Sequence, residues 1–299
     1  NSDVDEMIWP NRYVLTCVGL WPHKPNDSHS VTISSTLRIM VVAIVLFVSV
    51  LNQLDMLSSN WRDIDVLTET GLTLMASVLL LLKLLYVFNR RSDFHGAYRM
   101  IGSFWRLAKT QGERNQIVDL ANNARLCTLI FIYCGVFYIS LLSVGTYFVT
   151  MWNRAHANGS EYVHRTPYCH WSGVDDSDTS PNYELILVLQ SMSAFVALCT
   201  AVAIDISVML ILMHVAGQFR LISFRLQIIG RQMSRVDELP SHLIGGFNKE
   251  IRSCIIHQQI MLSLFEYLEK LLSPLTFGQF LISALEICFA GWALIEADT

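Results

Sequence analysis

The sequence contains little charge for its length. Only 15% of its 299 residues are Asp, Glu, Lys or Arg, whereas an ordinary globular domain has about 25%. The formal net charge is −4, so the chain also lacks the basic excess by which proteins attract nucleic acid. We therefore expect no nucleic-acid partner.

Disulfide and catalytic patterns are missing as well. The seven cysteines are odd in number and lie mostly in apolar stretches, which is not the pattern of a disulfide framework. The chain has no His-Glu-x-x-His, no Gly-x-Ser-x-Gly and no glycine-rich phosphate loop. His156, His164 and His170, with Cys169, match no closed zinc spacing. We expect a solvated loop there, no enzyme activity, and neither cofactor nor metal.

Five long apolar runs are what the sequence does contain. Each is long enough to cross a bilayer core, which takes about 20 predominantly apolar residues. The runs are apolar on all sides, unlike a soluble helix, and they lack the alternation of a membrane barrel. We therefore predict an all-α polytopic membrane bundle whose spans are the runs 37–57, 71–88, 126–152, 185–217 and 271–295.

Basic residues gather in alternate links between these runs. Of the 21 lysines and arginines, 17 lie in the N-terminal arm up to Arg38, between the second and third runs, or between the fourth and fifth. The positive-inside rule then predicts a cytoplasmic N-terminus. Of two glycosylation sequons, Asn158-Gly159-Ser160 falls in an outside loop and could carry sugar, whereas the sequon at Asn26 falls inside and should stay bare.

Helical spacing continues beyond the runs. Apolar residues recur with a helical period over 94–108 and 247–268, which predicts that the cytoplasmic links continue as helices. Pro240 and the pair Gly245-Gly246 predict the turn between spans four and five. We expect four parts, namely a cytoplasmic amphipathic arm (1–36), spans one to four with a ligand pocket in their outer halves (37–216), a cytoplasmic link with an amphipathic anchor helix (217–270), and the fifth span (271–299).

Four ionisable residues lie away from the ends of the runs. Such groups are costly in a membrane unless they are paired or hydrated, and they often mark function. Asp205 and Glu286 are candidates for carboxylates that attract or gate cations. Each could equally be a carboxylate satisfied by neighbouring hydroxyl or backbone groups. Lys83 is expected to extend toward the cytoplasmic surface, and His214 to be a hydrogen-bonded core histidine.

The outer halves of spans two to four suggest a ligand pocket. They combine aromatic, sulfur-containing and small polar side chains, as does the lining of a site for a small, mostly apolar ligand. Ordinary helix packing through small residues is the alternative for each residue. The candidates for ligand binding are Met75, Ser143, Gly145, Tyr147, Phe148, Met192 and Phe195. Ser77 and Ser193 also lie in the outer halves of spans two and four.

Several short motifs resemble one known family. The segment before and within the fifth run contains Cys254-Ile255…His257-Gln258 followed by Gln279-Phe280…Ile287-Cys288…Gly291. The N-terminal arm carries Pro10-Asn11-Arg12 and Gly19-Leu20-Trp21-Pro22, and the fourth run leaves through Gln218-Phe219-Arg220-Leu221. In order and spacing these motifs resemble those of insect odorant receptors over nearly the whole chain.

The resemblance implies a seven-span, odorant-gated, non-selective cation channel. In that family an odorant-binding subunit assembles with a common co-receptor as a heterotetramer in the membrane of sensory-neuron dendrites. The link 217–249 is short, whereas the family's co-receptor has a long insertion there. In this respect the chain resembles an odorant-binding (tuning) subunit. The family's cytoplasmic anchor implies subunit contacts through His257, Met261, Phe265 and Leu268. Two of the expected seven spans are absent, so we expect a trimmed chain.

Three other classes share some of these features. A gustatory-type relative would have the same architecture and bind a polar tastant. A G-protein-coupled receptor would have an outside N-terminus and an outer cysteine on span three, whereas Cys127 lies at its inner end. A transporter should show internal repeats and broken spans, which the sequence lacks.

Overall fold

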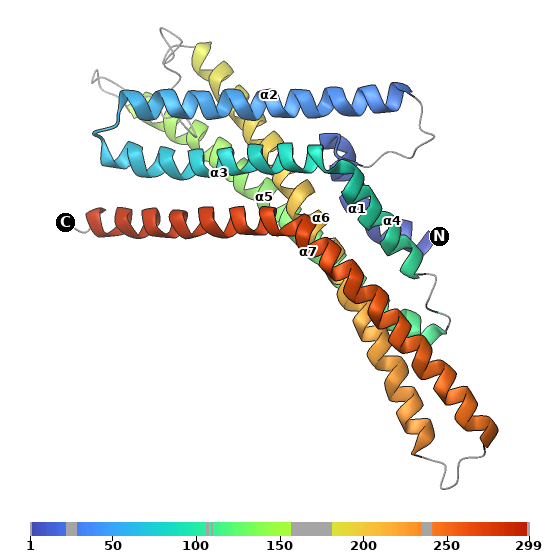
Figure 1. Cartoon of the computed structure of the whole chain (residues 1–299). Coiled ribbons are helices and arrows are strands. Elements are labelled where there is room, and N and C mark those ends of the chain that lie inside the picture. Colours follow the sequence, from blue (N-terminus) through green and yellow to red (C-terminus); the bar gives the residue numbers. More distant parts are fainter. Residues whose placement is uncertain are drawn as a thin grey trace. The chain divides into compact units, whose positions relative to one another are not determined.

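The computed structural model describes residues 2–21, 29–105, 108, 110–156, 181–234 and 241–297. Within these ranges the secondary structure is helical and contains no strand. Figure 1 shows the helices, which are α1 (Ser2–Val18), α2 (His29–Ser59), α3 (Ile64–Asn89), α4 (Arg91–Phe104), α5 (Gln111–His156), α6 (Asn182–Met233) and α7 (Ser241–Ala297).

The five predicted spans correspond to five long helices. In length and composition α2, α3, α5, α6 and α7 can each cross a membrane, which confirms the all-α, five-span prediction. The helices extend beyond the apolar runs. The stretches 94–108 and 247–268 were predicted to be helical, and they lie largely in α4 (Arg91–Phe104) and wholly in α7 (Ser241–Ala297). The continuation of α6 to Met233 was not predicted.

The predicted place of Gly245 and Gly246 in the turn between spans four and five is wrong. Gly245 and Gly246 lie inside α7, whose first residue is Ser241, and Pro240 lies outside the described residues. A glycine costs about 1 kcal/mol within a helix. A 57-residue helix can accommodate two of them in its first turns, where the apolar spacing that follows holds the rest of the helix in place.

The chain divides into two compact units. Unit 1 comprises Asn1–Arg12, Arg90–Leu129 and Asp205–Pro274, and unit 2 comprises Tyr13–Asn89, Ile130–Ile204 and Leu275–Thr299. The helices α1, α5, α6 and α7 are each divided between the two units, with one segment in unit 1 and another in unit 2. The units are described separately below.

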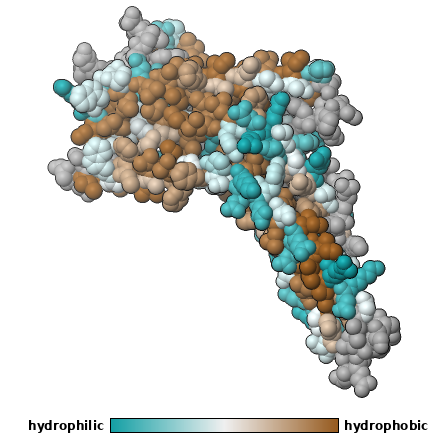
Figure 2. Space-filling model, viewed as in Figure 1, coloured by the Kyte–Doolittle hydropathy of each residue, from teal (hydrophilic) through white to brown (hydrophobic). Residues whose placement is uncertain are grey.

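In unit 2, α2 and α3 pack against each other over their length. Leu46, Leu80 and Leu84 are buried there. Many other large apolar side chains remain exposed, and Figure 2 shows hydrophobic residues covering the visible face of α2 and α3. An apolar surface of this extent is typical of helices that contact lipid.

In unit 2 the end of α1 is tied to the start of α2. Gly19 has a φ of 89°, a left-handed conformation that glycine adopts without the penalty other residues incur. The hydroxyl of Ser35 donates to the Gly19 carbonyl oxygen at 2.6 Å. A Cβ at position 19 would lie 2.5 Å from the Ser35 carbonyl oxygen, so this contact requires glycine.

Unit 1 is held by an apolar seam and one ion pair. Ile211, Leu221 and Met261 are fully buried. The Arg225 guanidinium of α6 donates to both Glu113 carboxylate oxygens of α5, at 2.7 and 3.1 Å. Glu113 also closes a capping box with Thr110, because each backbone N–H bonds the other's side chain at 3.3 Å. The ion pair thereby fixes the N-terminus of α5 to α6.

Candidate ligand-binding site

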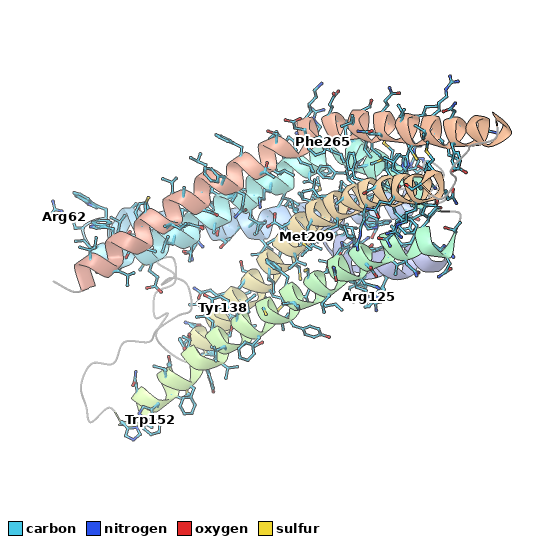
Figure 3. The ribbon with its side chains drawn as sticks, turned by 90° about the horizontal axis from the view of Figure 1, so that it is seen from below. Arg62, Arg125, Tyr138, Trp152, Met209 and Phe265 are labelled. Atoms are coloured by element: carbon cyan, nitrogen blue, oxygen red, sulfur yellow. The ribbon has the colours of Figure 1, made fainter. Side chains whose placement is uncertain are left out.

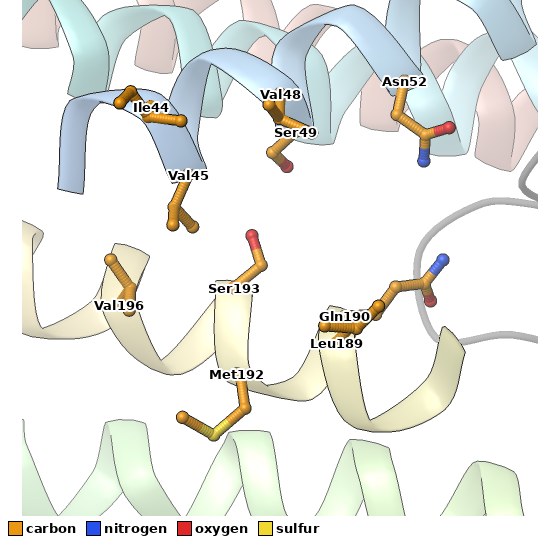
Figure 4. Close-up of a pocket in the computed structure, with 10 residues that line it drawn as sticks. All are labelled: Ile44, Val45, Val48, Ser49, Asn52, Leu189, Gln190, Met192, Ser193 and Val196. Carbon is orange, nitrogen blue, oxygen red and sulfur yellow. The ribbon is translucent and has the colours of Figure 1, made fainter. Parts of the chain in front are cut away.

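The candidate site lies in unit 2, between α2 and α6. It is a cavity of about 350 Å³, within the size range of small-molecule sites. Figure 4 shows Ser49 facing Ser193 and Asn52 facing Gln190 across it, with aliphatic side chains beside them. Its lining residues are Ile44, Val45, Val48, Ser49, Asn52, Leu189, Gln190, Met192, Ser193 and Val196.

A second cavity continues the first toward α3. It measures about 180 Å³ and shares four of the same lining residues, so the two form one composite site, which we call the unit 2 cavity. The shared residues are Ser49, Asn52, Gln190 and Ser193. The second part adds Leu46, Gln53, Thr73, Ala76, Ser77, Ala194 and Ala197.

Small residues explain why space remains between these three helices. Where large side chains would interdigitate, α3 and α6 place Ala76, Ser77, Ser193, Ala194 and Ala197. Small residues allow helices to approach closely in membranes. When three helices diverge slightly, however, the same residues leave the volume between them unfilled. The result is an apolar cavity with a few neutral polar groups.

The polar groups of the cavity are bonded mainly within their own helices. The Ser77 hydroxyl donates to the Thr73 carbonyl oxygen at 2.8 Å, and the Thr73 hydroxyl donates to the Thr70 carbonyl oxygen at 3.0 Å. The Gln53 amide nitrogen donates to the Ser49 hydroxyl at 3.5 Å. The lining is therefore neutral, with hydroxyl and amide groups held in place by helical backbone.

The predicted ligand-binding residues are only partly brought together here. Met192 lines the cavity, as do Ser77 and Ser193 from the same spans. Met75 and Gly145 are half-buried outside it. The hydroxyl of Ser143 lies 2.9 Å from that of Ser191, which donates to it, so Ser143 joins α5 to α6.

The aromatic candidates lie on the surface of unit 2. Tyr147, Phe148 and Phe195 are all exposed, and Phe148 is 64% exposed. Figure 3 shows the same segment of α5, where the labelled Tyr138 and Trp152 are also exposed. In the described chain these rings do not form a shared pocket with Met192.

The residues of α2 were missed by the sequence analysis. Ser49, Asn52 and Gln53 all contribute to the cavity. A signal was present, because these are polar residues one helical turn apart near the end of an otherwise apolar run. The inference requires knowing which face of α2 meets α6, and periodicity within an all-apolar helix does not reveal that.

The ionisable residues within the spans differ from one another. Lys83 does not extend to the surface as predicted. It is only 5% exposed and donates to Gln279 Oε1 of α7 at 2.5 Å. A buried ammonium is stabilised by such a charge-assisted hydrogen bond, which explains the difference. Asp205 and Glu286 are half-buried, and their proposed roles in cation passage stay predictions.

His214 is a core histidine, as predicted. Its Nδ1 bonds the Leu210 carbonyl oxygen at 2.8 Å, and its ring lies 6.0 Å from that of Trp105. Nearby in unit 1, burial raises the pKa of the Tyr98 hydroxyl strongly, although a hydrogen bond with Ser207 opposes the effect.

The four predicted subunit-contact residues also separate. His257, Met261 and Leu268 are buried against this chain's own helices, and only Phe265 is exposed, at 46%. The helix carries exposed apolar neighbours on the same stretch, namely Ile255, Ile256, Ile260 and Leu262. The sequon at Asn158 and the segment with His164, Cys169 and His170 lie outside the described residues.

Comparison with known proteins shows similarity to odorant receptors. A family model described as 7tm Odorant receptor matches residues 63–298. The structure of the insect olfactory receptor OR5 from Machilis hrabei is similar, with 12% identity, coverage of 97% of this chain and 71% of that chain, and a TM-score of 0.61. The same receptor in complex with eugenol has 12% identity, 98% and 72% coverage and a TM-score of 0.68.

The two similar structures support the fold of this chain, and the family model identifies the family. No curated protein matches the chain. At 12% identity a similar backbone does not carry over individual site residues. The family model, however, covers well over half of the sequence, and it agrees with the five membrane helices. The chain therefore belongs to the 7tm odorant receptor family.

Proposed function

We propose that this chain is the odorant-binding subunit of a heteromeric, ligand-gated, non-selective cation channel in the cell membrane. The observation that carries the proposal is the apolar unit 2 cavity, lined by neutral hydroxyl and amide groups on spans of an odorant-receptor family member. A related fold is known in complex with eugenol, which supports a small volatile ligand here. The chain then acts by binding and without catalysis.

The mechanism follows from population shift. An apolar odorant leaves water, enters the cavity and binds the open arrangement more tightly than the closed one. A ligand can shift the equilibrium only by its differential affinity, so a single small molecule requires the two states to differ by only a few kcal/mol. Asp205 and Glu286 are candidates for the carboxylates that cations encounter.

The deciding experiment is electrical. Cells that express this chain with a family co-receptor should show odorant-evoked cation currents within milliseconds and without added nucleotide. Cells that express the co-receptor alone are the control. Responses that depend entirely on G-protein signalling, with no direct current, would overturn the channel proposal. Activation by polar tastants and not by volatiles would favour the gustatory-type alternative.

The partner surface that we propose is the exposed apolar row on α7 in unit 1, made of Ile255, Leu262 and Phe265. This stretch precedes the expected fifth span, so lipid would not cover it, and apolar rows in water are typical of protein interfaces. A co-receptor subunit is the proposed occupant. Leu262→Asp should reduce co-purification with the co-receptor, whereas Lys270→Asp on the exposed polar face should not.

The proposed orientation places the N-terminus in the cytoplasm. It rests on the distribution of the 17 basic residues. Asn158→Gln should remove an endoglycosidase-sensitive mass shift, whereas Asn26→Gln should leave the mass unchanged. Glycosylation at Asn26 and not at Asn158 would show that the N-terminus lies outside, which contradicts the proposed orientation. We propose that the receptor lies in the membrane of sensory-neuron dendrites, and family membership supports this proposal.

A further inference from the structure

We propose that the unit 2 cavity selects neutral ligands that carry a hydrogen-bond donor on an apolar body, as aliphatic alcohols and phenols do. The proposal rests on the proposed function, since it names the odorant class for the cavity assigned there. The proposal is based on two observations, namely that hydroxyl groups of the lining already donate their protons within the protein and that, among the described residues, an amide oxygen accepts no hydrogen bond.

The hydroxyl groups that α3 presents have used their protons. Thr73 donates to the Thr70 carbonyl oxygen at 3.0 Å, and Ser77 donates to the Thr73 carbonyl oxygen at 2.8 Å. A hydroxyl group has one proton and two lone pairs. Both side chains line the cavity, so what they offer a ligand is acceptor capacity.

Gln53 adds a third acceptor. Its side chain is 3% exposed and lines the cavity, and its amide nitrogen donates to Ser49. Within the described part of the chain its Oε1 accepts no hydrogen bond. A buried carbonyl oxygen without a donor is unfavourable, so a ligand that supplies the donor gains this interaction.

The remaining lining excludes other ligand classes. None of the residues that line the two parts of the cavity is charged, so an ammonium or carboxylate ligand would be buried without a counter-ion. At Thr73, Ser77 and Gln53 an ether, ester or ketone would place another acceptor against lone pairs, so such a ligand gains hydrogen bonds only from the other amide and hydroxyl groups of the lining. A lipid acyl chain would fill the apolar volume but leave these acceptors without a donor. A neutral hydroxyl group meets both requirements.

The test compares isomers that differ only in the donor. The purified chain, reconstituted in phosphatidylcholine nanodiscs, is titrated with octan-1-ol against heptyl methyl ether, and with 4-propylphenol against 4-ethylanisole. Binding is measured as the shift in thermal midpoint, which rises with ligand concentration over Kd. In at least one pair the hydroxyl compound should bind about fivefold more tightly, the typical effect of one hydrogen bond.

The variants assign the preference to the cavity. Gln53→Leu should remove most of the alcohol preference, and Ser77→Ala, which is compatible with the helix, provides the same test if Gln53→Leu fails to fold. Gln259→Leu, at an exposed position of α7 outside the cavity, is the matched control and should keep the preference. Equal binding of ethers and alcohols, binding of neither class, or a preference unchanged in both cavity variants would overturn the proposal.

The failure of this inference and of the proposed function are distinguishable. If an alcohol binds with the expected preference but evokes no current with the co-receptor, the channel proposal is wrong and the ligand class stands. If ethers evoke currents at the same concentrations as alcohols, the ligand class is wrong and the channel proposal stands.

Discussion

Units 1 and 2 are stabilised by different kinds of contact. In unit 1 an ion pair joins Arg225 of α6 to Glu113 of α5, and the Tyr267 hydroxyl of α7 donates to the Asp93 backbone carbonyl oxygen of α4. In unit 2 neutral hydroxyl groups join the helices, as in Tyr183 with Thr150 and in Ser191 with Ser143. Lys83 with Gln279 is an exception.

This difference has a physical basis. Charged groups are costly in lipid, so a part of the protein that crosses the bilayer depends on small residues and neutral hydrogen bonds. A part in water can use ion pairs and caps. It also explains why the cavity lies in unit 2, since a scaffold packed through Ser and Ala leaves neutral, apolar volume.

The ion pair of unit 1 should be its most sensitive contact. Arg225→Met leaves the buried Glu113 carboxylate without its partner, which should cost about 3 kcal/mol and lower the thermal midpoint of the purified receptor clearly. The double variant Glu113→Gln/Arg225→Met is the control. Glutamine preserves the capping box, so much of the stability should return. Equal loss in the single and double variants would show that charge isolation is not the cause.

The glycine at the end of α1 should tolerate no side chain. Gly19→Ala adds a Cβ close to the Ser35 carbonyl oxygen, in a left-handed conformation. We expect a loss of about 2 kcal/mol, measured by thermal unfolding. Gly102→Ala in α4 is the matched control, because a Cβ there meets no atom within 4 Å and alanine favours the helix. If Gly19→Ala leaves the stability unchanged, the close contact with the Ser35 carbonyl oxygen does not exist as described.

The hydroxyl contacts of unit 2 should each contribute less. Tyr183→Phe removes the buried hydrogen bond to Thr150 at 3.0 Å, and we expect a loss of about 1 kcal/mol. Tyr147→Phe, on the exposed surface of α5, should change stability by less than about 0.5 kcal/mol. If both variants behave alike, neutral hydrogen bonds do not distinguish unit 2 in the way proposed.

Much of the fold could be predicted from the sequence. Twenty or more apolar residues in a row determine that a segment is helical in a membrane, since every backbone group must be bonded within it. Family membership also followed from motifs such as Cys254-Ile255…His257-Gln258, and the model match over 63–298 confirms it. Helix ends were less predictable, as the Gly245-Gly246 pair inside α7 shows.

The candidate site could be predicted only in outline. The sequence indicated a mostly apolar pocket with small polar groups on spans two to four. Met192, Ser77 and Ser193 do line the cavity, whereas its described lining includes none of the candidates on span three. It did not indicate Ser49, Asn52 or Gln53. An apolar helix has no polar stripe to show which face is buried, so the contributing faces become known only when the helices are packed together.

The amino-acid order alone was sufficient to establish five membrane helices, their polar continuations and the family, because hydrophobicity and motif spacing are local properties of the chain. The packed molecule decided which side of each helix faces its neighbours. That rotation buries Lys83 against Gln279, exposes Phe148 and leaves the acceptor of Gln53 facing a cavity. Rotation depends on how side chains from distant segments fit, which no single segment encodes.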